Sequence, residues 1–184
     1  MAILKRKKIA ENTKEIDQLD GFSSPDKLLI LAKNNNLELK PLDVESLIRL
    51  LGIGLRIHPM DEQKSGYIKL EEGRWVIGVN SLQHPNRQRF TMGHEIGHFI
   101  LHKDQIGDGI EDTLLFRASG FGEPGIEKEA NEFAAKLLMP EFYFKQEIER
   151  FQGDIKAISR SMKLSSMAVS IRAQHLGYKV KNEI

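Results

Sequence analysis

One short run constrains this chain more than any other: residues 91–98 read Thr-Met-Gly-His-Glu-Ile-Gly-His and contain the pattern His-Glu-x-x-His. Histidines four positions apart on a helix lie about 6 Å apart on one face, so both imidazoles can reach one metal ion. The intervening Glu95 lies beside them. The run therefore predicts a helix with a zinc hydrolase site, in which His94 and His98 bind the metal and Glu95 is the catalytic residue.

The rest of this helix divides into two faces. At about 100° per residue, apolar side chains cover one arc, and the other carries residue types that bind metals or transfer protons: Thr91, His94, Glu95, His98 and His102. Positions 90–102 contain no Lys or Arg, whereas a merely solvated face is normally rich in Lys and Glu. Gly93 and Gly97 each cost the helix about 1 kcal/mol relative to alanine, which predicts that another segment approaches its backbone closely.

A catalytic zinc site usually has three protein ligands, so a third must come from elsewhere in the chain. Residues 126–140 predict a second helix that ends in proline. Its periodicity places Glu127 and Asn131 on or beside the apolar face and turns Glu129 and Glu132 toward water. Glu127 is the predicted third ligand, and Asn131, one turn further on, is predicted to orient a ligand histidine.

His102 is the competing third ligand. It lies two turns, about 12 Å along the helix axis, from His94, and a metal held between His94 and His98 is poorly placed to reach it. We expect His102 instead to be a histidine at the helix end, where the helix dipole favours a positive charge.

This ligand set predicts amide hydrolysis without a covalent intermediate. Zinc lowers the pKa of water toward about 7 and polarises a carbonyl, while Glu95 takes the proton from that water and passes it to the leaving amine. Manganese and iron also suit a site of two histidines and one carboxylate. The oxyanion needs a further stabiliser, and the sequence does not choose among its candidates: Tyr67, Tyr143, His175, His58 and His84.

The stretch before this helix predicts two helices, which follow Ser24 and Pro41, and then a small sheet. Three strand-like runs, residues 54–58, 66–70 and 74–79, are so closely spaced that an antiparallel meander is the simplest arrangement. We expect an α+β, zincin-like fold with a small antiparallel or mixed β-sheet beside the active-site helix. The glycine-rich residues 104–125 predict a mobile flap over the cleft.

Composition indicates an intracellular protein. The chain has no cysteine, so a metal must be bound by histidine and carboxylate side chains. No apolar run is long enough to span a membrane, and no apolar segment of a signal peptide follows the basic residues 5–8. We therefore expect a cytoplasmic protein with a flexible basic and polar lead, residues 1–20, followed by a metallopeptidase domain, residues 21–150.

The C-terminal segment, residues 151–184, has the spacing of a helix-turn-helix unit. Residues 155–162 predict one helix, Ser165 is the predicted N-cap of the next, and a second helix over residues 166–176 ends at Gly177. The segment carries six Lys and Arg against two Asp and Glu, and Arg172, His175 and Lys179 lie on or just beyond the second helix. Direct DNA binding is one interpretation, but packing or partner docking is favoured because many helical hairpins share this spacing.

Two motifs together resemble the ImmA/IrrE family of zinc-peptidase-like proteins. They are the run over residues 89–102 and the run Glu-x-x-Ala-Asn-x-Phe-Ala-Ala-x-Leu-Leu-Met-Pro over residues 127–140. The resemblance extends from about residue 25 to about residue 178. It implies a metallo-endopeptidase with His94, His98 and Glu127 as metal ligands and Glu95 as the catalytic glutamate. It also implies a protein substrate, typically a helix-turn-helix repressor or an antitoxin, in prophages, mobile elements, stress responses or toxin-antitoxin loci.

Two other functions use the same fold. A zinc-containing regulator could dock on its partner or on DNA without cutting it, and a toxin component could be neutralised by a bound partner. Neither gains much from Glu95. The presence of both histidines, Glu95 and a glutamate on the apolar face of the second helix therefore favours the endopeptidase.

Overall fold

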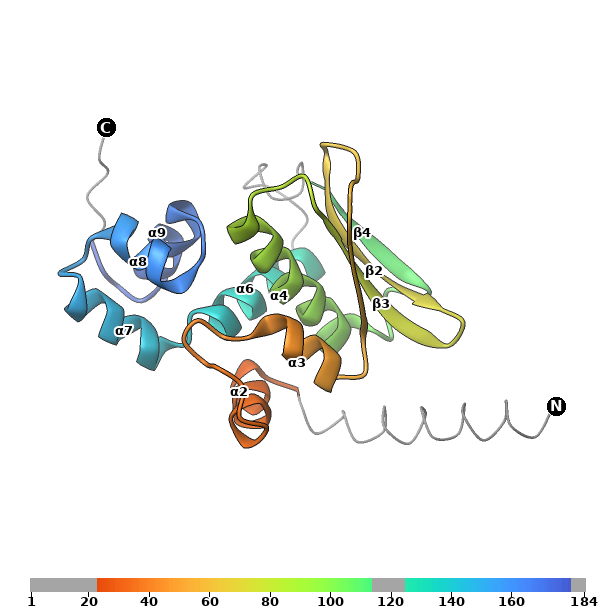
Figure 1. Ribbon diagram of the computed structural model, residues 1–184, viewed down its shortest axis with the longest axis horizontal. Helices are drawn as coiled ribbons and strands as arrows, with labels where there is room; N and C mark the ends of the chain where they lie inside the picture. The colour runs from red at the N-terminus through yellow and green to blue at the C-terminus, as the bar shows by residue number, and fades with distance from the viewer. Residues whose placement is uncertain (1–22, 114–124, 180–184) are drawn as a thin grey trace.

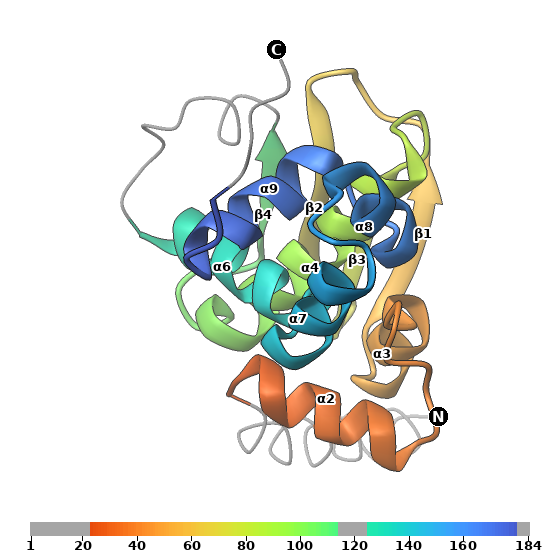
Figure 2. The ribbon, with the colours of Figure 1, turned by 90° about the vertical axis from the view of Figure 1, so that its left-hand side faces the viewer.

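The structure is a computed structural model that describes residues 23–113 and 125–179. A four-stranded sheet forms one side of the molecule, and the helices lie against one of its faces (Figure 1). α4 (Pro85–His102) and α6 (Ile126–Leu138) lie between the sheet and the C-terminal helices (Figures 1 and 2). The other helices are α2 (Pro25–Asn34), α3 (Val44–Leu50), α7 (Glu141–Arg150), α8 (Ile155–Met162) and α9 (Ser166–His175). The predicted α+β class is confirmed.

The sheet is mixed, with the strand order β1-β3-β2-β4. Its strands are β1 (Gly54–His58), β2 (Lys64–Glu71), β3 (Arg74–Asn80) and β4 (Gly109–Thr113). β1 pairs with β3 in parallel, whereas β2 pairs antiparallel with both β3 and β4. The predicted antiparallel meander is therefore wrong. β3 is the most buried strand and lies between β1 and β2, and residues 59–63 are long enough to cross the two strand spacings, about 10 Å.

Asn80 holds this crossing link in place. Its side chain is fully buried, and Oδ1 accepts hydrogen bonds from the backbone N–H groups of Met60, at 3.1 Å, and Leu82, at 3.0 Å. Nδ2 donates to the carbonyls of Asp61, at 3.1 Å, and Lys64, at 2.8 Å. One amide therefore satisfies backbone groups of the β1–β2 link and of the connection from β3 to α4.

β4 lies where the sequence predicted a flap. Residues 109–113 pair with β2, with Ile110 opposite Ile68, so the flap prediction is wrong for this part of the chain. The strand escaped prediction because its sequence, Gly-Ile-Glu-Asp-Thr, contains only one large apolar residue. Residues 114–124 of the predicted flap lie outside the described residues, as does the predicted lead over residues 1–20.

A single hydrophobic core includes buried side chains from the sheet and from α2, α3, α4, α6, α7, α8 and α9. Two side-chain hydrogen bonds attach the C-terminal helices, α7, α8 and α9, to the rest of the chain. Arg172 Nε donates to the carbonyl of Met139 at 3.1 Å, and Asn86 Nδ2 donates to the carbonyl of Leu164 at 2.9 Å. Among the described helices, none is long and apolar enough to cross a membrane.

α8 and α9 form at the predicted positions and are joined by a three-residue turn. Lys163 adopts the left-handed conformation, with φ of 53°, and the Ser165 hydroxyl accepts a hydrogen bond from the backbone N–H of Ala168 at 3.1 Å. This is the predicted N-cap of α9. The relation of the pair to DNA-binding helix-turn-helix units stays a prediction.

Candidate metal centre

α4 is buried along most of its length because it lies between the sheet and α6 (Figure 1). Every residue from Thr91 to Phe99 is buried. The helix begins at Pro85, and His84 is its N-cap, with Nδ1 accepting from the backbone N–H of Asn86 at 3.1 Å. His84 therefore serves the helix terminus in this structure.

The close approach that the glycines of α4 predicted is made by α6. A Cβ atom on Gly97 would lie 3.1 Å from both the Cα and the carbonyl oxygen of Ala130, and one on Gly93 would lie 2.8 Å from Cδ1 of Leu138. A side chain on Gly97 would press on the backbone of α6, whereas one on Gly93 would displace the end of the Leu138 side chain. The small residues thus bring the polar face of α4 within reach of the first turn of α6.

His94, His98 and Glu127 converge between the two helices. His94 Nε2 lies 3.2 Å from Glu127 Oε2, His98 Nε2 lies 3.1 Å from Glu127 Oε1, and the two Nε2 atoms lie 2.9 Å apart. Both histidines are fully buried, and Glu127 is 7% exposed. One ligand atom from each residue falls within 4.8 Å of the other two, an arrangement that can hold a metal ion.

The electrostatics of Glu127 agree with this arrangement. Burial alone would raise the pKa of its carboxyl group, but the contacts with the His94 and His98 rings outweigh burial and hold the pKa well below its usual range. Glu127 is therefore a carboxylate at neutral pH, buried against two imidazoles.

Asn131 lies where periodicity predicted it, one turn beyond Glu127. Its Oδ1 atom is 3.0 Å from His94 Nδ1. An amide oxygen only accepts hydrogen bonds, so His94 carries a proton on Nδ1, and Nε2 is the ring nitrogen left to bind a metal ion. Two nitrogens and a carboxylate oxygen then converge with electron-rich atoms, and this donor set fits a divalent cation such as zinc, manganese or iron.

Glu95 is fully buried between α4 and β2. A Cβ atom on Gly66 of β2 would lie 3.4 Å from Glu95 Oε1 and 2.5 Å from Cγ2 of Thr91. β2 can approach this face of α4 so closely only because position 66 lacks a side chain, since a Cβ atom there would clash with Thr91. Glu95 thus lies on the sheet side of α4 and directly follows the ligand His94 in the sequence.

The structure does not bring the predicted oxyanion stabilisers to this cluster. Tyr67 lies on the outer face of the sheet, because Gly66 and Ile68 on either side of it point toward α4, and its hydroxyl is 3.4 Å from His58 Nε2. Tyr143 is on α7, which follows the end of α6 remote from Glu127, and its ring contacts Phe142 and Lys40. His175 is exposed on α9. Strand alternation could have placed Tyr67 on the face of the sheet opposite to Ile68 from the sequence alone.

His102 is the last residue of α4, at the helix end as predicted. It is 1% exposed and lies between two partners: its Nδ1 is 3.2 Å from His98 Nδ1, and its Nε2 is 2.9 Å from Glu129 Oε2. It is not one of the three clustered ligands. The four-residue spacing from His98 was the sequence signal for this contact, since such pairs are neighbours on a helix.

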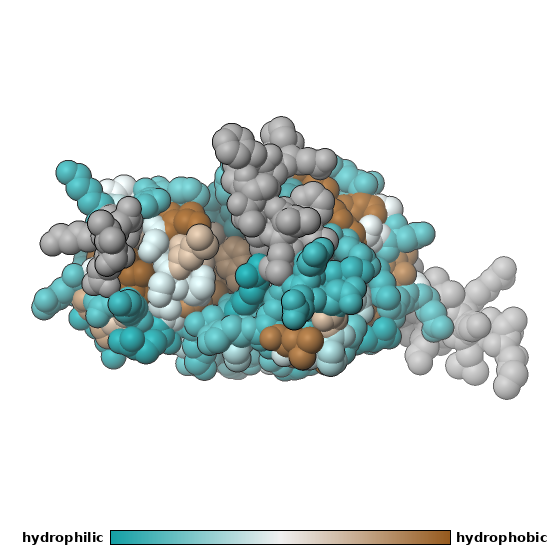
Figure 3. All heavy atoms as spheres, turned by 90° about the horizontal axis from the view of Figure 1, so that it is seen from above, coloured by the Kyte–Doolittle hydropathy of each residue, from teal (hydrophilic) through white to brown (hydrophobic). Residues whose placement is uncertain are grey.

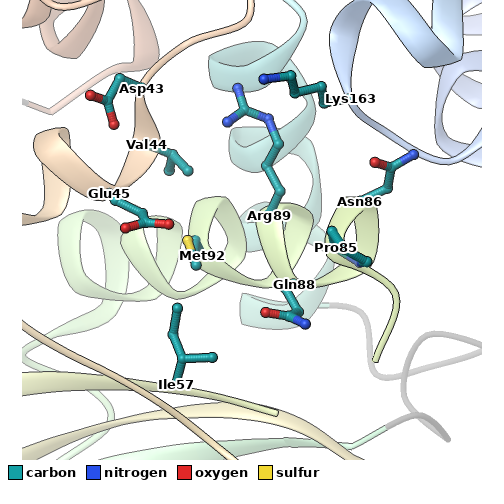
Figure 4. Close-up of a pocket in the computed structure, with 10 residues that line it drawn as sticks. All are labelled: Asp43, Val44, Glu45, Ile57, Pro85, Asn86, Gln88, Arg89, Met92 and Lys163. Carbon is teal, nitrogen blue, oxygen red and sulfur yellow. The ribbon is translucent and has the colours of Figure 1, made fainter. Parts of the chain in front are cut away.

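A pocket of about 270 Å³ lies elsewhere, between α3 and the first turns of α4 (Figure 4). Arg89, Asp43 and Glu45 are among the side chains that line it, together with Lys163 from the turn between α8 and α9. None of the clustered ligands lines this pocket, so it is separate from the candidate metal centre.

The α+β fold and the buried His-His-Glu group indicate a metal-binding protein. The model of the IrrE N-terminal-like domain, peptidase M78, matches residues 49–174. The chain belongs to this ImmA/IrrE family of metallopeptidases, which confirms the resemblance seen in its two motifs.

Three relatives illustrate the family. The radiation response metalloprotease IrrE of Deinococcus radiodurans is 33% identical over 124 residues, which cover 65% of this chain and 35% of that protein. IrrE of Deinococcus deserti is 31% identical over 140 residues, which cover 70% of this chain and 44% of that protein. A Bacillus phage phi105 protein named "Uncharacterized immunity region protein 2" is 27% identical over 106 residues, which cover 58% of this chain and 62% of that protein. The chain thus spans less than half the length of the two Deinococcus proteins.

Proposed function

We propose that this chain is a zinc-dependent endopeptidase that hydrolyses a peptide bond in a DNA-binding repressor or antitoxin-type protein. Its activity would regulate transcription of a prophage, mobile element, stress response or toxin-antitoxin locus. The observation that carries this proposal is the buried convergence of His94, His98 and Glu127, with Glu95 on the same helix.

His94, His98 and Glu127 are the residues that would hold the metal ion. When bound, the ion supplies Lewis acidity, which polarises the scissile carbonyl and lowers the pKa of water. The Glu95 carboxylate accepts a proton from the attacking water and delivers it to the amide nitrogen as the C–N bond breaks. Asn131 keeps the His94 ring turned so that Nε2 faces Glu127.

The name of the phage relative supports a repressor as the substrate. The phage relative carries the words "immunity region" in its name, and a repressor is the regulatory protein expected in such a region. The same relative is matched over 62% of its length, a larger share than in the Deinococcus proteins. A small helix-turn-helix protein encoded beside this gene is therefore the substrate to test first.

The surface of α9 favours a protein partner over DNA. Arg172, which the sequence offered as a DNA contact, is 7% exposed, and its Nε is occupied by the carbonyl of Met139. The exposed residues of α9 include Met167 and Ile171 and no Lys or Arg. Figure 3 shows apolar and weakly polar side chains over the C-terminal helices. Phosphate contacts by Lys and Arg contribute much of the affinity in DNA binding, and the exposed face of α9 carries neither, although His175 and the flanking Lys163 and Lys179 are exposed.

The decisive experiment incubates the purified, zinc-loaded protein with that helix-turn-helix protein and looks by mass spectrometry for one discrete cut. Glu95→Gln should abolish the cut and retain zinc, because the variant keeps all three ligands. Glu132→Gln, on the exposed side of α6, is the matched control and should cut normally. Binding without cleavage by the wild type would reject the proposal and favour a regulator or toxin that acts by docking.

A further inference from the structure

The two ligand histidines have different partners on their outer nitrogens. His94 Nδ1 faces the amide of Asn131, whereas His98 Nδ1 faces Nδ1 of His102, a second imidazole. His102 in turn places Nε2 against the carboxylate of Glu129, whose side chain is 63% exposed. A row of three side chains, Glu129, His102 and His98, thus runs from solvent to the candidate metal centre.

Hydrogen-bond chemistry allows one arrangement of protons in this row if His98 presents a lone pair to a metal. His98 Nε2 lies beside the Glu127 carboxylate and is the nitrogen that would bind the metal, which leaves the ring proton on Nδ1. That N–H is buried and needs an acceptor, which is His102 Nδ1. His102 must then carry its own proton on Nε2 and donate it to the Glu129 carboxylate, at 2.9 Å. Every ring nitrogen in the row is satisfied.

We propose that His102 and Glu129 are positioning residues for His98: they fix the tautomer and the ring orientation in which Nε2 binds the metal. This inference rests on the proposed metal site and deepens it. Partners that hydrogen-bond to a ligand histidine typically contribute about 10-fold to 100-fold to metal affinity. His102 is not itself a ligand in this arrangement, because its Nδ1 lies on the side of the His98 ring opposite to Nε2.

Zinc affinity, measured by competition with a chromophoric chelator, tests the proposal without recourse to catalysis. His102→Leu removes the acceptor and should weaken zinc binding about 10-fold to 100-fold. His102→Gln keeps an acceptor oxygen and should restore affinity to within about threefold of the wild type. Glu129→Ala should weaken binding by about threefold only, since water can replace an exposed carboxylate. Glu132→Ala, a matched exposed glutamate of α6, should leave affinity unchanged.

The outcomes distinguish a failure of this proposal from a failure of the proposed zinc-dependent function on which it rests. If the wild type binds no zinc, the proposed function fails. If the wild type binds zinc and a folded His102→Leu variant binds it equally well, only the positioning role is rejected.

Should His102→Leu not fold, as judged by circular dichroism, nitrogen-15 spectra of the zinc-loaded wild type decide the question. His98 should carry its proton on Nδ1 and His102 on Nε2. The opposite tautomer on either ring would overturn the proposal.

Discussion

Two buried glutamates at different places in the molecule make an informative comparison. Glu127 of α6 faces the imidazoles of His94 and His98, whereas Glu147 of α7 faces the ammonium group of Lys40 at 3.0 Å and accepts a hydrogen bond from the hydroxyl of Ser161. Burial by itself would raise the pKa of both carboxyl groups. The polar partners lower each pKa by more than burial raises it, so both lie below the ordinary value. A buried carboxylate paired with a lysine is structural, whereas one that lies beside two histidine ring nitrogens suits a metal ion from outside.

The largest expected effect is on metal binding. Glu127→Gln keeps the shape of the side chain and removes its charge, so zinc affinity should fall at least about 100-fold, or about 2.7 kcal/mol. Glu147→Gln makes the same chemical change at the other site and should leave zinc affinity unchanged. Chelator competition on both proteins checks this, and equal losses in the two variants would break the distinction.

The second effect is on folding. Glu147→Gln leaves Lys40 without its carboxylate and weakens the contact with Ser161, so the free energy of unfolding should fall by about 2 kcal/mol. Urea denaturation of the metal-free protein measures this loss. An unchanged urea midpoint would show that Glu147 contributes nothing to the attachment of α7 to its neighbours.

Acid should remove the same contribution. The pKa of Glu147 is lowered in the folded protein from its ordinary value of 4.5, so its stabilising effect is fully present above that pH and is lost as the pH falls through the lower, folded value. The difference in unfolding free energy between the wild type and Glu147→Gln should therefore be complete at pH 6 and shrink as the pH falls below 4.5. A difference that grows on acidification would contradict the assignment.

The smallest expected change in zinc affinity concerns the close packing of α6 against α4, which places Glu127 beside the histidines. Gly97→Ala places a methyl group against the backbone of Ala130, which cannot rotate away, and should weaken zinc binding about fivefold, or about 1 kcal/mol. Gly93→Ala meets the end of the flexible Leu138 side chain and should leave zinc affinity within twofold. The pair of variants therefore compares two glycines of one helix.

Much of this site could be predicted from the sequence because it is built on two helices. Helical periodicity placed Glu127 and Asn131 on or beside the buried face and Glu129 on the exposed one; in the structure Glu127 is buried, Asn131 is half-buried and Glu129 is exposed. It could not show that His102 is buried, because that depends on packing between α4 and α6. The order of the strands could not be predicted either, because it depends on contacts between residues distant in the sequence. The Asn80 side chain, which holds the β1–β2 link, is an example, since nothing in the neighbouring sequence indicates this role.

The position of β3 between β1 and β2 bears on the order in which the sheet can assemble. β2 and β3 form a hairpin with Glu71 opposite Arg74, so they can pair as soon as both have been synthesised. β1 precedes both in the chain, yet it pairs with β3, from Gly54 opposite Val76 to His58 opposite Asn80. On a nascent chain β1 must therefore wait, with its backbone unpaired, until the hairpin that follows it is complete.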